Sequence, residues 1–478
     1  MRTVKKLLFV LSTVSVLTSS LCGQMFCNAS TDSLKYDLNI DGKVNSTDLS
    51  ILKRLVLDMD VKVTGSPDIN GDGKVNSLDY VILKKYLTNP VKTSDDVYKA
   101  NTNFAFDIFK ELNKEDADKN INISPISIST AVSMVYQGAG TNTKAAIANA
   151  LRYKGLDTDT INQSYKELLG YLNQSDPKVS LSLNNSLWYR SGFEVNNNFL
   201  SMNKDVFGSY ISSLDFSKPD AANIINGWIS DTTRGKITSM ISPPIPDDVC
   251  MYLFNAVYFN GQWVNAFDSA KSFKGKFTSS QNVNKDVLYM RKEYTKAYSG
   301  EFGRGSDYTA VRIPYAGGNI AMYAILPDSG EGINDFINSL DGSKWNAIKQ
   351  SICPVQDLEL TIPRFKVTYG IKSLKKQLSD MGMKEAFTGS ADFSGICDKS
   401  YSPDTHISDV LHNSIVEVTE EGTVAAAVTE VIVVATPGPN PQPVTKSVFS
   451  ATRPFVYVIA DDKTGTILFT GKVSDIGD

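Results

Sequence analysis

The sequence predicts an α+β protein preceded by a small, wholly helical domain. Three observations support this prediction. After residue 97, apolar residues first recur at helical spacing. Runs of β-branched and aromatic residues then dominate the remainder of the chain. Before residue 97, one stretch occurs twice, at 37–57 and 68–88, and each copy ends in a short amphipathic segment of helical spacing. A chain of 478 residues is too long for one ordinary domain.

The composition is that of an ordinary globular protein, with 42% hydrophobic and 21% charged residues. The net charge of −4 argues against a nucleic acid or an anionic membrane as the main partner. No segment after the N-terminal one is long and apolar enough to cross a membrane.

The N-terminus has the charge order of a secretory signal peptide, assigned here to residues 1–29. Arg2, Lys5 and Lys6 precede the apolar run Leu7 to Leu17, and small residues follow. Cleavage after Ala29 and cleavage near Cys22 both fit the sequence. The protein is therefore expected to be secreted.

The cysteines beyond the leader are few. Cys250, Cys353 and Cys397 form an odd and sparse set, so we expect buried small side chains rather than a disulfide framework.

The repeated stretch has the residue types of a calcium loop. Oxygen-bearing residues occupy loop positions one, three, five, nine and twelve, and position seven offers a backbone carbonyl, which suits a hard divalent cation. A pair of Asx-rich turns explains the agreement between the copies less well. The predicted ligands are Asp37, Asn39, Asp41, Lys43, Asn45 and Asp48 in the first copy, and Asp68, Asn70, Asp72, Lys74, Asn76 and Asp79 in the second.

Residues 31–90 resemble a type I dockerin on these two loops and the helices that follow them. The resemblance implies two Ca²⁺ sites, folding coupled to metal binding, and attachment to a cohesin domain of a cellulosome scaffoldin. It implies cohesin contacts from Ser46, Thr47, Lys53, Arg54, Ser77, Leu78, Lys84 and Lys85. The second copy has Leu78 where the first has Thr47, so the cohesin-contacting surfaces of the two copies are not equivalent. Residues 91–96 are predicted to be a linker.

The large domain, 97–478, is predicted from its periodicities. Helices are expected around Phe104 to Leu112, Ser127 to Tyr136 and Lys144 to Leu151. Strands are expected at Cys250 to Phe259, Tyr308 to Ile313, Ile320 to Leu326, Asp357 to Ile362, Ser414 to Thr419 and Phe455 to Ile459.

A run of small residues, 420–429, separates a strand-like stretch from a proline-rich one, 436–443. Local composition alone favours a surface linker. The same residues could also enter a sheet, because Gly422 provides a hinge and Thr423, Ala425, Ala427 and Thr429 would share one face.

The large domain resembles the serpin family across essentially all of 97–478. The matching pieces are 122–128, Gly138-Ala139 with Thr143, 254–263, 362–365, 378–387, 391–395, 453–456 and 467–471. The resemblance implies a serpin fold with large mixed sheets and an exposed reactive-centre loop. It places the hinge of that loop at Glu420, Gly422, Thr423, Ala425, Ala426 and Ala427.

The activity implied by the resemblance is inhibition of a serine protease. The protease would cut the loop, remain attached as an acyl-enzyme, and be dragged away as the hinge inserts into the sheet. The resemblance assigns sheet-gating roles to Ser124, Ser127, Asn255, His412, Trp263 and Arg364, the last paired with Glu420.

The reactive bond is predicted at Ala435–Thr436, with Val434–Ala435 as the alternative, because Pro437 follows Thr436. No Lys or Arg lies between Glu421 and Lys446, which favours subtilisin- or elastase-like proteases over trypsin-like ones.

Two other functions compete with inhibition. An enzyme is disfavoured, because the only histidines, His406 and His412, lie close together in the C-terminal stretch and no nucleophile elbow or zinc spacing occurs. A non-inhibitory serpin-fold binding or adaptor protein would be favoured by bulky or charged hinge residues, and the hinge has neither.

Overall fold

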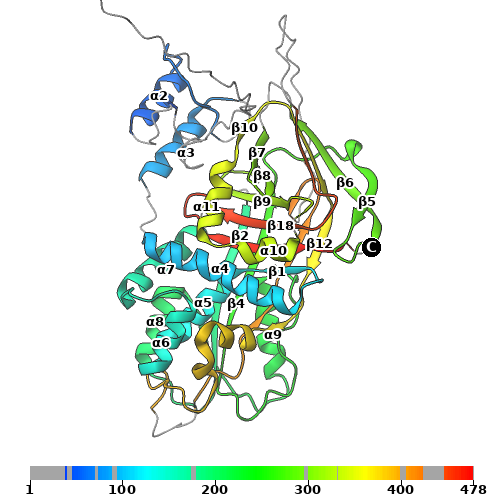
Figure 1. Cartoon of the computed structure of the whole chain (residues 1–478). Helices are drawn as coiled ribbons and strands as arrows, with labels where there is room; N and C mark the ends of the chain where they lie inside the picture. The colour runs from blue at the N-terminus through cyan, green and yellow to red at the C-terminus, as the bar shows by residue number, and fades with distance from the viewer. Residues whose placement is uncertain are drawn as a thin grey trace, which may run out of the picture.

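The computed structural model describes residues 38–39, 46–69, 74–88, 94–173, 179–294, 300–330, 332–398, 405–423 and 446–476 (Figure 1). The helices of at least seven residues are α2 (Ser46–Val56), α3 (Ser77–Thr88), α4 (Asp95–Glu115), α5 (Pro125–Tyr136), α6 (Thr141–Ala150), α7 (Thr158–Leu172), α8 (Asn197–Phe207), α9 (Ala221–Thr232), α10 (Ile333–Ser339) and α11 (Gly342–Ser351). Shorter helical segments are α12 (Lys375–Leu378), η1 (Ser269–Lys271), η2 (Ser379–Met383) and η3 (Lys384–Phe387).

A six-stranded sheet forms the centre of the large domain, in the order β12-β15-β16-β4-β2-β3. Its strands are β12 (Phe365–Thr368), β15 (Ile415–Val418), β16 (Gly422–Thr423), β4 (Met251–Gln262), β2 (Val179–Arg190) and β3 (Tyr210–Leu214). The long strands β2 and β4 are antiparallel, from Val179 opposite Gly261 to Tyr189 opposite Met251.

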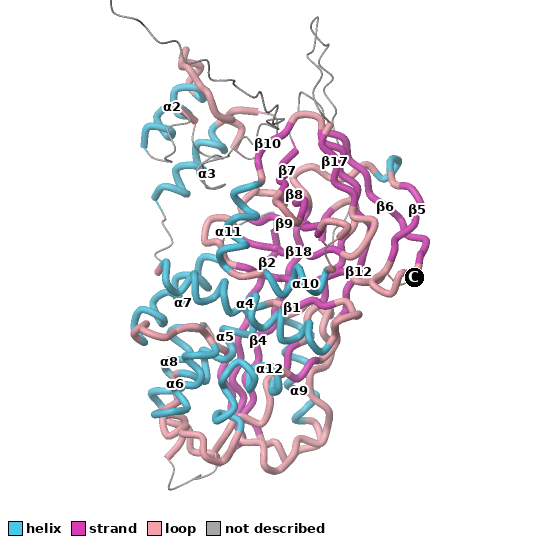
Figure 2. The backbone as a smooth tube through the Cα atoms, viewed as in Figure 1, coloured by secondary structure: helices cyan, strands magenta, loops and turns pink. Residues whose placement is uncertain are grey.

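Two further sheets complete the domain (Figure 2). A seven-stranded sheet runs in the order β1 (Ile121–Ile123), β19 (Ile467–Val473), β18 (Phe455–Asp461), β9 (Ile320–Pro327), β8 (Tyr308–Pro314), β7 (Gly300–Arg304) and β10 (Cys353–Val355). A four-stranded sheet contains β17 (Ser447–Ser450), β11 (Leu358–Pro363), β6 (Asn284–Tyr294) and β5 (Phe273–Thr278). A short pair joins β13 (Lys372–Ser373) to β14 (Leu411–His412).

The main core lies between these layers because neighbouring strands are apolar on the faces they share. β9 and β18 are buried along their whole length, which is typical of strands covered on both sides. Helices cover both faces of the six-stranded sheet: α5 packs against β4 within the main core, and α9 packs on the opposite side through Ile225 and Ile229. The sheet is therefore enclosed along its middle.

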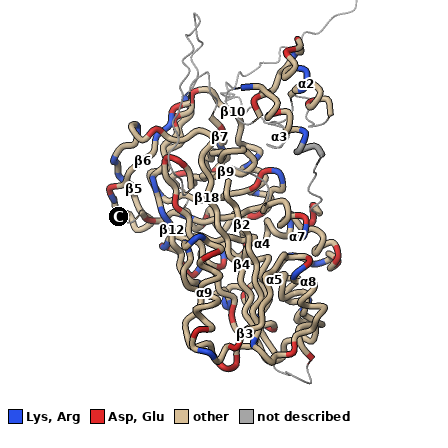
Figure 3. The backbone as a smooth tube through the Cα atoms, turned by 180° about the vertical axis from the view of Figure 1, so that it is seen from behind, with Lys and Arg blue, Asp and Glu red and all other residues tan. Residues whose placement is uncertain are grey.

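Charged residues of both signs are interspersed along the backbone, as Figure 3 shows. Within the described residues, no helix is long and apolar enough to cross a membrane.

The sequence-based fold prediction is confirmed by this architecture. The three expected helices correspond to α4, α5 and α6, and the expected strands to β4, β8, β9, β11, β15 and β18. Most ends differ by a few residues, but α4 begins nine residues before the expected Phe104. The cysteine prediction is only partly right. Cys397 is buried, but Cys250 and Cys353 are half-exposed. The predicted signal peptide lies outside the described residues.

Candidate functional site

The strand β16 marks the point where the predicted hinge enters the six-stranded sheet. Its residues Gly422 and Thr423 lie opposite Gln262 and Gly261 of β4. On its other side, Thr423 lies opposite Val418 of β15. The chain from Val418 to Thr423 thus makes a tight turn and begins a new strand between β15 and β4.

Glycine is required at position 422 for two reasons. Its φ is +151°, in a region that L side chains rarely adopt. A Cβ atom there would also lie 2.1 Å from the carbonyl oxygen of Gly261. Any side chain at 422 would therefore separate β16 from β4.

Thr423 points into the protein rather than toward solvent. Its side chain is 2% exposed, and its hydroxyl shares a hydrogen bond of 2.7 Å with the hydroxyl of Tyr315. The Tyr315 ring stacks on Trp263 at a centroid distance of 4.4 Å. Trp263 in turn donates its indole N–H to the Thr419 carbonyl at 2.9 Å. These aromatic residues thus line the place where the hinge begins.

Glu420 and Arg364, predicted to pair, are in contact. The guanidinium of Arg364 donates two hydrogen bonds to one carboxylate oxygen of Glu420. Ser272 donates to the other oxygen at 2.8 Å. Burial raises the pKa of Glu420, but the hydrogen bonds from Ser272 and Arg364 outweigh it and hold this pKa below its usual value. The carboxylate is therefore charged at neutral pH and fixes the turn before β16.

The other predicted gating residues gather beneath the middle of the sheet. The backbone N–H of Ser124 donates to Nε2 of His412 at 3.1 Å. The hydroxyl of Ser127 donates to the Asn255 carbonyl at 3.4 Å. The Asn255 side chain donates to Oδ1 of Asn185 at 2.5 Å. The cluster therefore joins α5 to β4, β2 and β14.

This cluster is buried, and two of its side-chain oxygens have no hydrogen-bond partner among the described residues. Burial lowers the pKa of His412 to about 4, so its imidazole is neutral at physiological pH. The side-chain oxygens Oγ of Ser124 and Oδ1 of Asn255 are buried without a hydrogen-bond partner among the described residues. Such orphan atoms cost free energy that a rearrangement of the sheet could recover.

The remaining predicted loop residues, Ala425, Ala426, Ala427, Ala435 and Thr436, lie outside the described residues. The chain is described again from Lys446, and β17 pairs parallel with β11 in the four-stranded sheet. The segment 424–445 thus connects two different sheets.

In both calcium-loop repeats, the aspartate at loop position twelve accepts a hydrogen bond from a backbone N–H near the start of the loop. Oδ1 of Asp48 accepts the backbone N–H of Leu38 at 2.8 Å, and Oδ1 of Asp79 accepts that of Ile69 at 2.9 Å. Both carboxylates are fully buried. Asn39, Asp68, Lys74 and Asn76 are also described, whereas the predicted ligands Asp37, Asp41, Lys43, Asn45, Asn70 and Asp72 lie outside the described residues. The buried carboxylates at position twelve suit a bound cation.

Most of the residues predicted to contact cohesin are exposed on α2 and α3. Seven of them are exposed: Ser46, Thr47, Lys53, Arg54, Ser77, Leu78 and Lys84. Lys85 lies on α3, and nothing further is described for its side chain.

Comparison with protein families decides the identity of both parts. The family model "Serpin (serine protease inhibitor)" matches residues 99–476. The chain belongs to the serpin family. The model of the type I dockerin domain matches the N-terminal part of this serpin, at 28–57, 35–88 and 66–105. Both family predictions made from the sequence are confirmed. Because serpins are generally protease inhibitors, membership agrees with the expectation that this chain is not an enzyme.

Curated relatives and solved structures agree with this assignment. The chain is 32% identical to human "Serpin B4" over 79% of this chain and 98% of the relative. It is 31% identical to the "Leukocyte elastase inhibitor" of Xenopus tropicalis over 80% and 99%. The native structure of Tengpin, a thermophilic serpin, matches with a TM-score of 0.72 and 27% identity over 80% of this chain and 95% of that one. Thyroxine-binding globulin in complex with thyroxine matches with a TM-score of 0.68 and 25% identity over 80% and 99%.

Sequence reasoning missed several residues of the site. Tyr315, which binds Thr423, follows β8 by one position, and nothing in its local sequence connects it to a segment more than a hundred residues later. Asn185 and Ser272 were missed for the same reason. β2 carries several other polar residues, among them Ser182, Asn184 and Ser186, so nothing in its sequence singles out Asn185.

Proposed function

We propose that this serpin is a secreted inhibitor of serine proteases that traps its target by inserting the segment 422–434 into the six-stranded sheet. The observation that carries the proposal is the position of β16 between β15 and β4. Two residues of the segment already occupy the place that a longer inserted strand would take.

The register of β16 extends naturally along β4. With Gly422 opposite Gln262 and Thr423 opposite Gly261, the same antiparallel register brings Ala425 opposite Phe259 and Thr429 opposite Asn255. Residues 251–260 pair with β2 on one side. Within the described chain, no strand pairs with them on the other side. Insertion would therefore satisfy an open strand edge.

The side chains of the inserting segment suit this path. Thr423 faces the protein interior against Tyr315, so alternation directs Ala425, Ala427 and Thr429 the same way. These small side chains enter without an unpaired charge. Glu430 would point to the opposite face of the inserted strand, away from Tyr315. Thr429 would also reach the level of Asn255, whose Oδ1 has no hydrogen-bond partner within the part of the chain that the structure describes.

The chemistry of trapping belongs to the protease. Its serine attacks the carbonyl carbon of Ala435, the bond to the nitrogen of Thr436 breaks, and Ala435 remains as an ester on the serine. Insertion of about thirteen residues at ~3.3 Å each moves that ester by on the order of 40 Å. Such a displacement distorts the oxyanion hole before water hydrolyses the ester. Small apolar residues at the bond favour subtilisin- or elastase-like targets.

The dockerin would attach this inhibitor to a cohesin domain on a cellulosome scaffold, with Ca²⁺ at the two loops of residues 31–90. We assign 1–29 to a signal peptide, 91–96 to a linker and 97–478 to the serpin domain. The exposed faces of α2 and α3 support the cohesin contact.

Incubation with subtilisin tests the trapping proposal. A complex that survives boiling in detergent is expected, together with a released C-terminal peptide whose mass identifies the reactive bond. Cleavage of the loop with full recovery of protease activity, repeated with elastase, would instead favour a non-inhibitory binding protein.

A further inference from the structure

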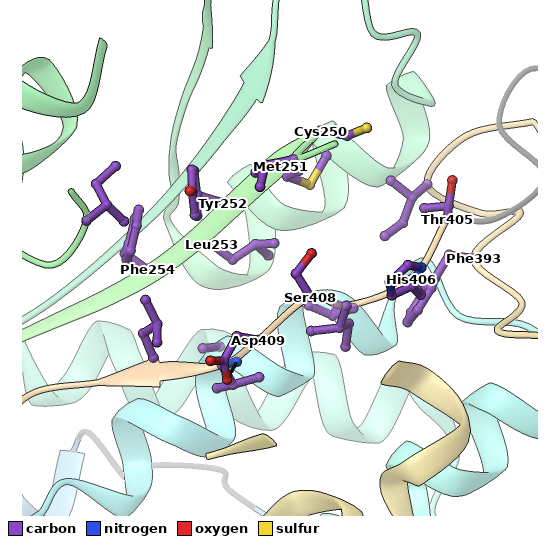
Figure 4. Close-up of a pocket in the computed structure, with 18 of the residues that line it drawn as sticks. Cys250, Met251, Tyr252, Leu253, Phe254, Phe393, Thr405, His406, Ser408 and Asp409 are labelled. Atoms are coloured by element: carbon purple, nitrogen blue, oxygen red, sulfur yellow. Dashed lines mark hydrogen bonds between the residues drawn. The ribbon is translucent and has the colours of Figure 1, made fainter. Parts of the chain in front are cut away.

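A cavity of about 600 Å³ lies in the serpin domain, between the first residues of β4 and the segment 405–411 (Figure 4). Asp248 and Asp409 line it, and the cations Arg190 and Lys375 bind backbone carbonyls of its wall. Charges of both signs therefore surround this cavity, and it indicates no one class of ligand. The surface of the dockerin is more specific.

Exposed apolar side chains are concentrated in the dockerin. Five of the twelve large hydrophobic residues that are exposed in the described part of the chain lie between residues 57 and 81. They are Leu57, Met59, Val75, Leu78 and Val81, and their exposed fractions run from 39% to 60%. Single exposed apolar residues are ordinary on a protein surface, but a group this dense in so small a domain indicates an interaction surface.

Leu78 and Val81 share the exposed face of α3. Residues three apart are neighbours on a helix surface, and Ser77 and Lys84 extend the same exposed face. Leu78 is 47% exposed and Val81 is 54% exposed, whereas Leu83 is fully buried in the small core of the domain. A β-branched valine at an exposed helix position gains neither helix propensity nor core contact. Its burial against a partner would give it a physical reason.

The first copy has polar residues at the same two places. Thr47 takes the position of Leu78 and Ser50 takes the position of Val81, and both are exposed on α2. The Ser50 hydroxyl donates to the Ser46 carbonyl at 2.8 Å, so its hydrogen bond is made within its own helix. The two helices thus expose equivalent positions but differ in hydrophobicity at two of them.

We propose that the dockerin engages cohesin through α3 rather than α2, with Leu78 and Val81 buried in an apolar recess of the cohesin and Lys84 facing an acidic group at its rim. This inference rests on the proposed attachment to cohesin. Removal of the two apolar side chains from water favours α3. The lysine is exposed on both helices, as Lys53 and Lys84, so it sets the charge of the rim without distinguishing the copies.

The binding test exchanges the two residue pairs between the copies in the full chain. Leu78→Thr with Val81→Ser gives α3 the residues of α2, and its affinity for an immobilised type I cohesin domain in calcium buffer should fall at least ~10-fold. Thr47→Leu with Ser50→Val is the matched reverse exchange, and it should not weaken binding because α3 is unaltered. Ile371→Thr, at a 50% exposed position of the serpin domain, is the control for loss of an exposed apolar side chain.

Two further measurements separate recognition from folding. Calcium titration of the Leu78→Thr, Val81→Ser chain should match that of the unaltered chain, because only exposed side chains change. The heat-capacity change of cohesin binding should be more negative for the unaltered chain than for this variant, since that change reports burial of apolar surface. An equal heat-capacity change in the two chains would contradict the apolar recess.

The inference and the proposed attachment fail in different ways. If the unaltered chain binds cohesin and Leu78→Thr with Val81→Ser keeps its affinity, or the reverse exchange loses as much, the choice of α3 is overturned and cohesin attachment stands. If the unaltered chain binds none of a panel of type I cohesin domains, attachment itself is refuted, and the choice of α3 is refuted with it.

Discussion

Thr423 and Tyr315 join their hydroxyl groups at 2.7 Å inside the protein, although Thr423 is the last described residue before the predicted reactive loop. The first inward-facing position of the hinge is therefore already closed to solvent. A residue at 423 must fit beside an aromatic ring, and a charge there would have no partner.

Thr423→Arg should convert the inhibitor into a substrate. Burying the guanidinium beside Tyr315 costs well over ~1.4 kcal/mol, so the partition between trapping and simple cleavage should shift by roughly tenfold or more. The measurement is the number of protease molecules that cleave per stable complex formed. Thr423→Ser keeps the hydroxyl and is the control. Undiminished trapping by the arginine variant would contradict insertion.

Arg364→Met should destabilise the protein by about 1–2 kcal/mol, because buried Glu420 keeps only Ser272 as a side-chain donor. Arg291→Met is a close control. Its guanidinium is 38% exposed against 48% for Arg364, but its carboxylate partners, Glu293 and Glu359, are 47% and 23% exposed against 6% for Glu420. The control should lose at most ~1 kcal/mol.

Urea unfolding measures both variants, and pH provides a second test. Because the pKa of Glu420 is lower in the folded protein than its ordinary value of 4.5, the charged carboxylate stabilises the fold at pH values above 4.5. That stabilisation is lost as the pH falls below 4.5 and through the lower pKa of the folded state. The difference between Arg364→Met and the unaltered protein should therefore shrink in acid. Equal losses in the two variants at pH 7 would show that carboxylate burial is unimportant here.

Much of this architecture could be predicted from the sequence. Long runs of β-branched and aromatic residues predict the strands β4, β8, β9 and β18, and the helical spacing of apolar residues predicts α4. The hinge was located only through the family resemblance, because its small residues fit a linker equally well.

The sequence did not predict contacts between residues that lie far apart along the chain. Tyr315 lies 108 positions before Thr423, and Asn185 lies 70 before Asn255. Such contacts depend on how sheets stack, which local periodicity does not encode. The cavity beside Leu253 also escaped prediction, because it arises where β4 and the segment 405–411 remain apart.

Asp79→Ala should abolish the calcium response of the second loop. The Asp79 carboxylate accepts backbone N–H groups from Ile69 and Asn76, so its removal unfolds the loop as well as removing a proposed ligand. Calorimetry should show Ca²⁺ affinity at that loop at least ~10-fold weaker. Asp60→Ala, at an exposed position outside both loops, is the control. Cohesin binding that persists in excess chelator would contradict the metal assignment.

His412 should make the serpin domain less stable in mild acid. Burial lowers its pKa to about 4, whereas the unfolded chain protonates near 6.5. The neutral form is favoured only in the fold, so stability is complete above pH 6.5 and is lost progressively as the pH falls from 6.5 to 4. Between pH 7 and 5 the loss from this residue is about 2 kcal/mol. Buried Asp461 opposes it, because burial raises its pKa to about 6 and the fold gains stability there on acidification.

Comparison of variants separates these two contributions. His412→Gln retains an acceptor for the Ser124 N–H but cannot be protonated in this range, so its stability should change by about 2 kcal/mol less between pH 7 and 5. His406→Gln, at an exposed position, should leave the acid loss in place. Urea unfolding at the two pH values gives the difference. Parallel pH profiles for His412→Gln and the unaltered protein would show that the imidazole beneath the sheet is not the group that senses acid.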